Sequence, residues 1–308
     1  MEEQQNMKYK DWLGQWLNNY IKPTVKQRTF EHYEDIVHRQ VVPRLGGYEL
    51  EALLPSVLQE FTAELCERYA VNTVSGIISV LKNSLKAARR TGIVDREYSD
   101  SIRMPKSREK EVSCFSVAEQ KKIERAILES GKDRLFGIVL RLYTGLRIGE
   151  LMALKWEDID LQRGALSVNK TCRDRWQNGQ YIRQLDTPKT VSSKRIIPIP
   201  KQLLPYLRAI KKRSLSAFLI SGKNGKNVPL RSYQKTFERL LKRESIPHKG
   251  FHALRHTFAT RALECGMDVK TLSEILGHKN ATITLNRYAH SLLEHKQEMM
   301  NKLGKLLQ

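Results

Sequence analysis

The stretch HALRHTFAT, residues 252–260, combines phosphate-handling side chains with an apolar stripe on one short segment. If the segment is a helix, His252 and Arg255 lie on one face, because residues three and four apart are neighbours on a helix surface. Leu254 and Phe258 then form an apolar stripe that anchors the helix from behind. The stretch therefore predicts an anchored helix that presents a histidine and an arginine to one point.

Further along the chain the sequence holds more groups that handle protons. We expect His256 to be a partly buried, structural histidine, and His278 to follow the end of an apolar helix in LGHKNATIT (276–284). Tyr288 lies in the polar context RYAH. A phenol has a pKa of about 10, so it needs nearby cations or a base before it can attack phosphorus.

A second arginine lies upstream in TGLRIGE, residues 144–150. Gly145 permits a tight turn with positive φ, and Arg147 then stands at the start of the next helix, where anions are attracted. Glu150, three residues on, could hold the guanidinium in place. The alternative is an ordinary salt bridge on a surface helix, which contributes little to stability.

Lys189 lies in TPKTVSSKRIIPI (187–199), between two β-like runs. A lysine in such a place is usually solvent-exposed, but near a phosphate it can donate a proton to a departing alkoxide. Arginines, histidines, a lysine and a tyrosine together can break a phosphodiester without a metal ion, because arginines neutralise the phosphate and the tyrosine supplies the nucleophile.

The charge of the chain points to a polyanionic partner. The net charge is +21, and residues 163–249 alone hold 21 Lys and Arg against 4 Asp and Glu. Such a concentration of one sign is typical of a nucleic-acid interface. A membrane surface is the weaker alternative, since no basic amphipathic helix with an aromatic face stands out.

The composition fits a folded cytoplasmic protein, with 40% hydrophobic residues over 308 positions. No apolar run approaches the ~20 residues that span a bilayer, and the acidic start MEEQQNMKYK does not resemble a signal peptide. The cysteines are far apart and are expected to be reduced; they are Cys66, Cys114, Cys172 and Cys265. We expect no metal site among them.

Apolar periodicity predicts four short helices over residues 8–92, which would form a compact bundle. The polar, charged segment 96–113 is the expected linker. Beyond it, Ser116 and Glu119 form a capping box that begins another helix.

The second half is expected to mix helices with a few strands. Helical pattern covers 134–143 and 148–154, and returns from about 201. Three short β-like runs lie between these parts, at 165–168, 181–185 and 195–199. Their alternation and the turn Asn178-Gly179 favour one small antiparallel sheet. The fold class is therefore mainly α with a small antiparallel β-sheet.

Five strings, taken in order, resemble those of the tyrosine recombinase (phage integrase) family, of the mobile-element integrase type: TGLRIGE, TPKTVSSKRIIPI, HALRHTFAT, LGHKNATIT and RYAH. The resemblance implies a helical core-DNA-binding domain at 1–95, a linker at 96–113 and an α+β catalytic domain at 114–308. An exchange tail at about 291–308 would pack on a neighbouring protomer.

The resemblance also implies an active site of six residues: Arg147, Lys189, His252, Arg255, His278 and Tyr288. Tyr288 would attack a DNA phosphate, form a 3′-phosphotyrosyl bond and free a 5′-hydroxyl. The two arginines would hold the non-bridging oxygens, and Lys189 would protonate the departing oxygen. His252 would take the proton of the tyrosine, and His278 would hydrogen-bond the phosphate. No cofactor, metal ion or ATP is expected.

By the same resemblance, the partners would be double-stranded DNA with two recombination sites and three further copies of the chain, as a homo-tetramer on DNA. A directionality factor is an optional further partner. Only about seven residues precede the first expected helix, so no separate arm-site domain is expected there.

Three alternatives stay open at this point. The first is a chromosome or plasmid dimer resolvase of the same family, and the second is a type IB topoisomerase, which reseals the same strand. The third is a non-catalytic DNA-binding accessory protein. Integration and excision of a phage or conjugative transposon is the preferred reading.

Overall fold

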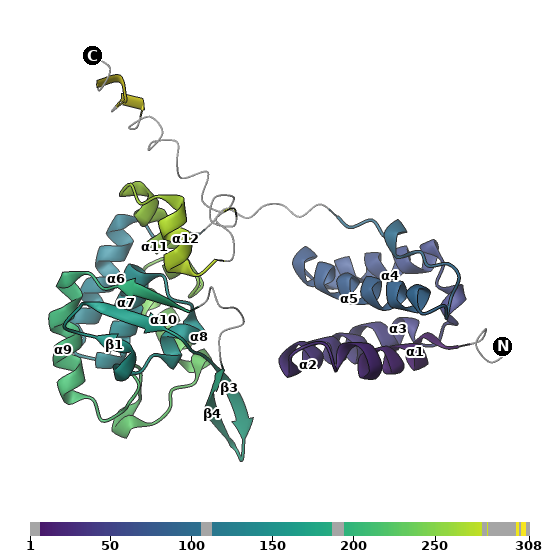
Figure 1. Cartoon of the computed structure of the whole chain (residues 1–308), viewed down its shortest axis with the longest axis horizontal. Helices are drawn as coiled ribbons and strands as arrows, with labels where there is room; N and C mark the ends of the chain where they lie inside the picture. Colours follow the sequence, from purple (N-terminus) through teal and green to yellow (C-terminus); the bar gives the residue numbers. More distant parts are fainter. Residues whose placement is uncertain are drawn as a thin grey trace. The chain divides into compact units, whose positions relative to one another are not determined.

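The computed structural model describes residues 7–105, 113–186, 194–278, 282, 300–301 and 303–305. The chain divides into two compact units, Met1–Lys110 and Glu111–Gln308 (Figure 1). Each unit has its own hydrophobic core, and each is described by itself below. None of the helices in the described ranges is long and apolar enough to cross a membrane.

The first unit is a helical bundle. Its helices are α1 (Tyr9–Trp16), α2 (Gln27–Ile36), α3 (Val42–Leu45), α4 (Pro55–Arg68) and α5 (Val71–Arg90). Leu17–Ile21 and Val37–Val41 continue α1 and α2 as π-helical turns. Figure 1 shows α4 and α5 side by side in one layer and α1 to α3 in the other. The helical bundle expected from the periodicity is confirmed.

A polar contact ties the two layers together inside the apolar core. Tyr9 and Trp12 on α1 are both buried, and they reach Ser84 on α5. The Tyr9 hydroxyl lies 2.6 Å from Ser84 Oγ, and Trp12 Nε1 donates to the Ser84 carbonyl at 3.0 Å. Ser84 Oγ itself donates to Leu81 O at 2.8 Å, so the tyrosine is the donor to Ser84. The core of this unit continues to Ile102.

The second unit is built mainly of helices: α6 (Val117–Glu129), α7 (Phe136–Thr144), α8 (Ile148–Ala153), α9 (Leu204–Arg213), α10 (Leu230–Arg243), α11 (Ala253–Glu264) and α12 (Val269–Leu276). The capping box expected at the start of α6 is present. Ser116 Oγ accepts from Glu119 N at 3.2 Å, and Glu119 Oε2 accepts from Ser116 N at 2.7 Å. Helix α7 is buried almost all round and packs on α11.

The strands form two separate antiparallel sheets, whereas the sequence favoured a single one. β1 (Ile159–Asp160), β2 (Ala165–Val168) and β5 (Arg195–Pro198) make one sheet in the order β1-β2-β5. β3 (Thr171–Gln177) and β4 (Gln180–Asp186) make the other. The three expected runs are strands, but their division depends on long-range pairing, which local alternation does not encode.

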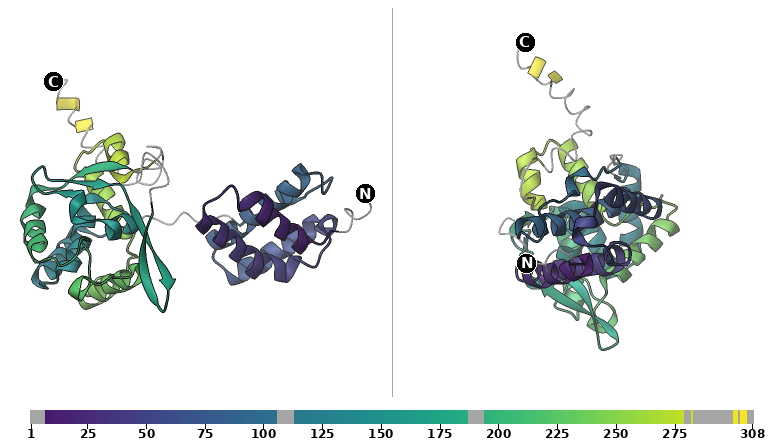
Figure 2. Two further views of the ribbon diagram at one scale, coloured as in Figure 1. Left: turned by 60° about the horizontal axis from the view of Figure 1, so that its bottom comes forward. Right: turned by 90° about the vertical axis from the view of Figure 1, so that its right-hand side faces the viewer.

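The β3–β4 pair is a hairpin that projects from the body of its unit (Figures 1 and 2). Its turn at Asn178-Gly179 has positive φ at both positions, as in the tight hairpin turn that Asn-Gly predicts. Its base is fixed at two points. Asp174 Oδ2 accepts from Leu230 N at 2.7 Å, and the Arg183 guanidinium stacks 4.3 Å from the centre of the Phe218 ring.

The Tyr9–Ser84 contact predicts an asymmetric pair of substitutions. Ser84→Ala leaves the buried phenol of Tyr9 without an acceptor, so the free energy of unfolding of the first unit should fall by about 1–3 kcal/mol. Tyr9→Phe leaves the hydrogen bond from Ser84 to Leu81 intact. It should lower the free energy of unfolding by only about 1 kcal/mol. Urea unfolding followed by tryptophan fluorescence measures both; an equal or reversed order would contradict the assigned donor.

Candidate active site

The turn between α7 and α8 brings Arg147 to its place. Gly145 ends α7 in the left-handed conformation, with φ of 63°. A Cβ at Gly145 would lie 2.5 Å from Phe258 Cδ1 and 2.8 Å from Leu276 Cδ2. Only glycine therefore fits here, both for its backbone and for the close approach of α11 and α12. Arg147 then stands immediately before the first residue of α8, as expected.

Arg147 is held from two sides. Its Nη1 donates to Glu150 Oε1 at 2.8 Å, and its backbone N–H donates to Glu150 Oε2 at 2.8 Å. On the other side, Nη2 donates to the Gly277 carbonyl at 2.9 Å. The side chain keeps 39% exposure. The guanidinium is thus fixed in orientation and accessible to a ligand.

Arg255 is the buried member of the pair, with 2% exposure. Its Nη1 donates to Gly145 O at 2.8 Å and its Nη2 to Leu276 O at 2.7 Å. The same Nη2 lies 3.0 Å from His278 Nε2, so this ring nitrogen is the acceptor. Burial and, to a smaller extent, the charge of Arg147 lower the pKa of the Arg255 guanidinium to about 9. A bound anion would relieve both effects.

The C-terminus of α12 accepts hydrogen bonds from the arginines of the site. Gly277 has φ of 64° and ends the helix, while His278 N donates back to Ser273 O at 3.0 Å. This arrangement turns the last carbonyl groups outward, and a helix C-terminus favours cations. The carbonyls of residues 275, 276 and 277 accept from Arg195, Arg255 and Arg147 in that order.

Glu150 is the carboxylate that balances this cluster within the described residues. It is 6% exposed and receives Arg195 Nη2 on Oε2 at 2.8 Å and Arg195 Nη1 on Oε1 at 3.1 Å, besides the bonds from Arg147. Burial alone would raise the pKa of Glu150. The hydrogen bonds and charge of Arg195, with the charge of Arg147, outweigh it and lower the pKa to about 2.

His252 precedes the first residue of α11 and is exposed. Its Nδ1 lies 3.5 Å from Nη2 of Arg141, a buried arginine on α7. Its ring packs edge-on to the partly buried His256, with ring centres 4.6 Å apart. The helix expected over 252–262 is present, and it places His252 one turn before Arg255.

The structure thus brings together Arg147, Arg255 and His278, with His252 immediately before the helix that carries Arg255. Lys189 and Tyr288 lie outside the described residues, and their roles stay predictions. Sequence reasoning missed two members of the cluster, Arg195 and Arg141. One signal for Arg141 was available in the sequence. It is the charged residue of the apolar run FGIVLRLYT, and a charge in such a run is unusual.

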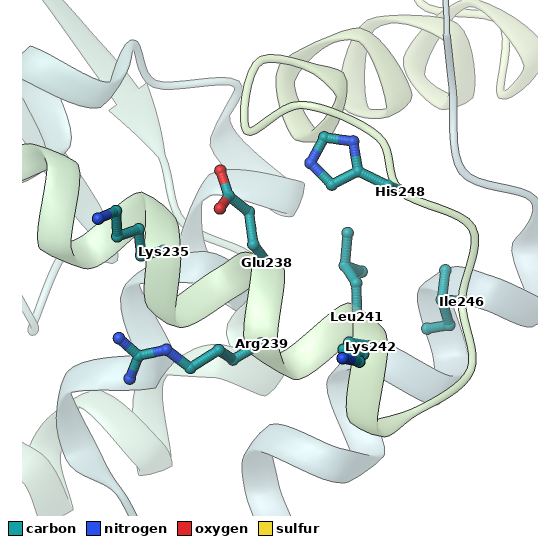
Figure 3. A pocket seen from close by; sticks show the side chains of 7 residues that line it. All are labelled: Lys235, Glu238, Arg239, Leu241, Lys242, Ile246 and His248. Carbon is teal, nitrogen blue, oxygen red and sulfur yellow. The ribbon is translucent and has the colours of Figure 1, made fainter.

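This arrangement is suited to a tetrahedral oxyanion. Guanidinium groups from α8 and α11 converge with a histidine, and planar N–H pairs match the oxygens of a phosphate. A separate hollow of about 570 Å³ lies along α10, lined by Lys235, Glu238, Arg239, Leu241, Lys242, Ile246 and His248 (Figure 3). Of the expected catalytic residues, the four that the structure describes do not line it.

The buried pair predicts a pH-dependent stability difference. Glu150→Gln leaves the buried Arg195 without its counter-ion, so the free energy of unfolding at pH 7 should fall by about 3 kcal/mol. The folded pKa of about 2 lies below the ordinary value of 4.5, so the wild-type advantage is complete above pH 4.5 and is lost as the pH falls towards 2.

Urea unfolding of both proteins across this pH range measures the difference. Glu157→Gln is the matched control, because Glu157 also forms ion pairs, with Lys155 and Lys170, but is 66% exposed; its substitution should leave the free energy of unfolding nearly unchanged. A pH-independent gap for Glu150→Gln would contradict the assigned pairing.

Comparison with known proteins identifies the family of the chain. The sequence pattern of the phage integrase family matches residues 117–295, and that of the phage integrase N-terminal SAM-like domain matches residues 8–66. The chain is 31% identical to the XerC-like tyrosine recombinase of Caldanaerobacter subterraneus subsp. tengcongensis, over 96% of this chain and 82% of that protein.

Proteins of mobile elements are also similar. The transposase from transposon Tn916 of Enterococcus faecalis is 26% identical, over 93% of this chain and 75% of that protein. The solved Tn1549 transposon integrase, in complex with transposon right end DNA, superposes with a TM-score of 0.79 at 26% identity, over 97% of this chain and 100% of that one. This chain therefore belongs to the phage integrase family and is a tyrosine recombinase, an enzyme that breaks and rejoins DNA strands.

Proposed function

We propose that this recombinase integrates and excises a mobile element, with Tyr288 as the nucleophile that attacks a scissile DNA phosphate. The observation that carries the proposal is the convergence of Arg147, Arg255 and His278 at the end of α12. The attack joins the tyrosine oxygen to phosphorus and breaks the bond to the 5′ oxygen. A 3′-phosphotyrosyl intermediate and a 5′-hydroxyl result.

The two arginines would stabilise the charge that develops on the non-bridging oxygens. Arg147 and Arg255 are both oriented by carbonyl groups before any substrate binds, so little reorganisation is needed. His278 lies against Arg255 and would add a contact to the same phosphate. Since the phosphotyrosyl bond keeps the energy of the broken linkage, the 5′-hydroxyl of a partner strand can reverse the step.

Proton transfers would complete the reaction. Lys189 would protonate the departing 5′ oxygen, because a flexible ammonium group is a suitable donor there. Family resemblance assigns the removal of the phenol proton to His252. The buried Arg141 lies beside Nδ1 of this histidine. We propose that no metal ion, ATP or other cofactor takes part, which cleavage in the presence of EDTA tests.

The partners and organisation follow from the chemistry. Exchange between two duplexes needs four strand cuts, so we propose a homo-tetramer on two DNA sites, in the cytoplasm of a bacterial cell. Residues 1–95 would be the core-DNA-binding domain, 96–113 the linker and 114–308 the catalytic domain with its exchange tail. The match of residues 8–66 to an integrase N-terminal domain supports the first of these.

Similarity to transposon and conjugative-element proteins favours a mobile element. The ICEBs1 integrase of Bacillus subtilis is 26% identical over 92% of this chain. Because the chain is also similar to a XerC-like tyrosine recombinase, resolution of chromosome or plasmid dimers is the second candidate function. Recombination of the element's own ends, compared with resolution of a plasmid dimer, separates the two.

Tyr288→Phe removes the nucleophilic oxygen, so it should abolish covalent adducts while DNA affinity stays within about twofold of wild type. Nicked suicide duplexes that carry the element's attachment sequence are incubated with each protein in EDTA and resolved on denaturing gels. Tyr206→Phe is the matched control, because Tyr206 is an exposed tyrosine of the same unit, and it should form adducts as wild type does.

An adduct with Tyr288→Phe, or none with wild type on a site that it binds, would contradict the proposal. The second result would favour a DNA-binding accessory protein. Formation of adducts without exchange between two duplexes would favour a topoisomerase.

Arg147→Lys keeps the charge but loses the planar fork, so the rate of adduct formation should fall by about 100-fold with DNA affinity nearly unchanged. The control is Arg163→Lys, whose side chain is 88% exposed. Equal rates for the two variants would show that Arg147 acts only as a point charge.

A further inference from the structure

Arg141 is the most deeply buried arginine beside the site, with 1% exposure. It lies on α7, and its guanidinium stacks 4.7 Å from the centre of the Phe251 ring. Its Nε and Nη1 have no hydrogen-bond partner among the described residues. Burial lowers the pKa of this guanidinium to about 9. Such a group is costly to bury, which calls for a reason beyond packing.

No carboxylate in the described part of the chain pairs with Arg141. Glu150 is near enough to attract it, but the oxygens of Glu150 already bind Arg147 and Arg195. The polar contact that remains for Arg141 among those residues is Nη2 to His252 Nδ1, at 3.5 Å. The buried charge is therefore directed at one nitrogen of a proposed active-site histidine.

We propose that Arg141 is a positioning residue that fixes the tautomer of His252, by holding Nδ1 as a hydrogen-bond acceptor so that the neutral ring carries its proton on Nε2. A guanidinium has five N–H donors and no acceptor, so it bonds only to a nitrogen with an available lone pair. In a neutral imidazole the other nitrogen then carries the hydrogen.

Two side chains contact the His252 ring among the described residues. Arg141 approaches from α7, and His256, one turn further on α11, packs against the ring at 4.6 Å. The contact with Phe251 keeps the guanidinium in place, since it covers one face of the planar group.

This assignment changes the role of His252 in the proposed reaction, on which it rests. A ring with its proton on Nε2 donates from that nitrogen, so it would hydrogen-bond a non-bridging phosphate oxygen beside the two arginines. It cannot take the proton of the Tyr288 phenol at Nε2. In the proposed reaction the phenol would lose its proton to solvent water, because the guanidinium groups of the site would stabilise the phenolate.

The tautomer can be read directly from the DNA-free, full-length protein labelled with ¹⁵N-histidine. Long-range ¹H–¹⁵N spectra distinguish a protonated from an unprotonated ring nitrogen, and His252→Gln identifies the signals. Wild type should show Nδ1 unprotonated and Nε2 protonated. In Arg141→Met both nitrogens should move towards the averaged values of a ring that exchanges between tautomers.

Two further variants separate positioning from folding. Arg183→Met is the matched control, because Arg183 also stacks on a phenylalanine and has an unpartnered Nε, but lies on β4; its His252 signals should equal those of wild type. Arg141→Lys keeps a group that only donates, so it should keep the wild-type tautomer. Should Arg141→Met not fold, the wild-type and Arg141→Lys spectra still test the proposal, because each shows which ring nitrogen of His252 carries the proton.

A protonated Nδ1 in wild type overturns the proposal, as do unchanged signals in a folded Arg141→Met. Suicide-duplex cleavage supplies the functional arm, where Arg141→Met should react roughly 10- to 100-fold more slowly than wild type. Because the spectra involve no DNA, failure of Tyr288 to form an adduct would leave the tautomer result standing, and the two proposals can fail separately.

Discussion

Three successive carbonyl groups at the end of α12 hold the site together. Residues 275, 276 and 277 each accept a hydrogen bond from a different arginine, and these arginines come from β5, α11 and the turn before α8. Segments that are distant in sequence are thereby joined at one helix terminus, whose partial negative charge suits cations. The geometry of the proposed phosphate-binding groups therefore depends on where α12 ends, and Gly277 determines that end by its left-handed conformation.

The charges in this cluster are only partly balanced, which supports the proposed binding of a phosphate. Glu150 compensates part of the positive charge and is itself held ionised by Arg195 and Arg147. Arg255 and Arg141 are buried without a carboxylate of their own among the described residues, and burial lowers the pKa of each. A site built in this way keeps its donors in place at the expense of stability, and an incoming oxyanion supplies the missing charge.

Local signals in the sequence were enough to place the two arginines of the proposed active site. A glycine turn before a helix predicted the position of Arg147, and helical spacing placed Arg255 beside His252. The same reasoning could not predict how deeply Arg255 is buried, or that Arg195 completes the cluster, because both depend on contacts more than twenty residues away in sequence. Strand β3 was missed because its charged and polar residues lack the apolar alternation of a half-buried strand.

The β3–β4 hairpin has a consequence for engineering. Its base is tied to α10 and to Phe218, whereas its turn at Asn178-Gly179 makes no contribution to the hydrophobic core. Exposed hairpin turns of this kind tolerate added sequence, because an insertion there lengthens the loop without disturbing packed side chains. The turn is therefore the natural point at which to attach a fluorophore or a small fused domain to follow the enzyme on its DNA.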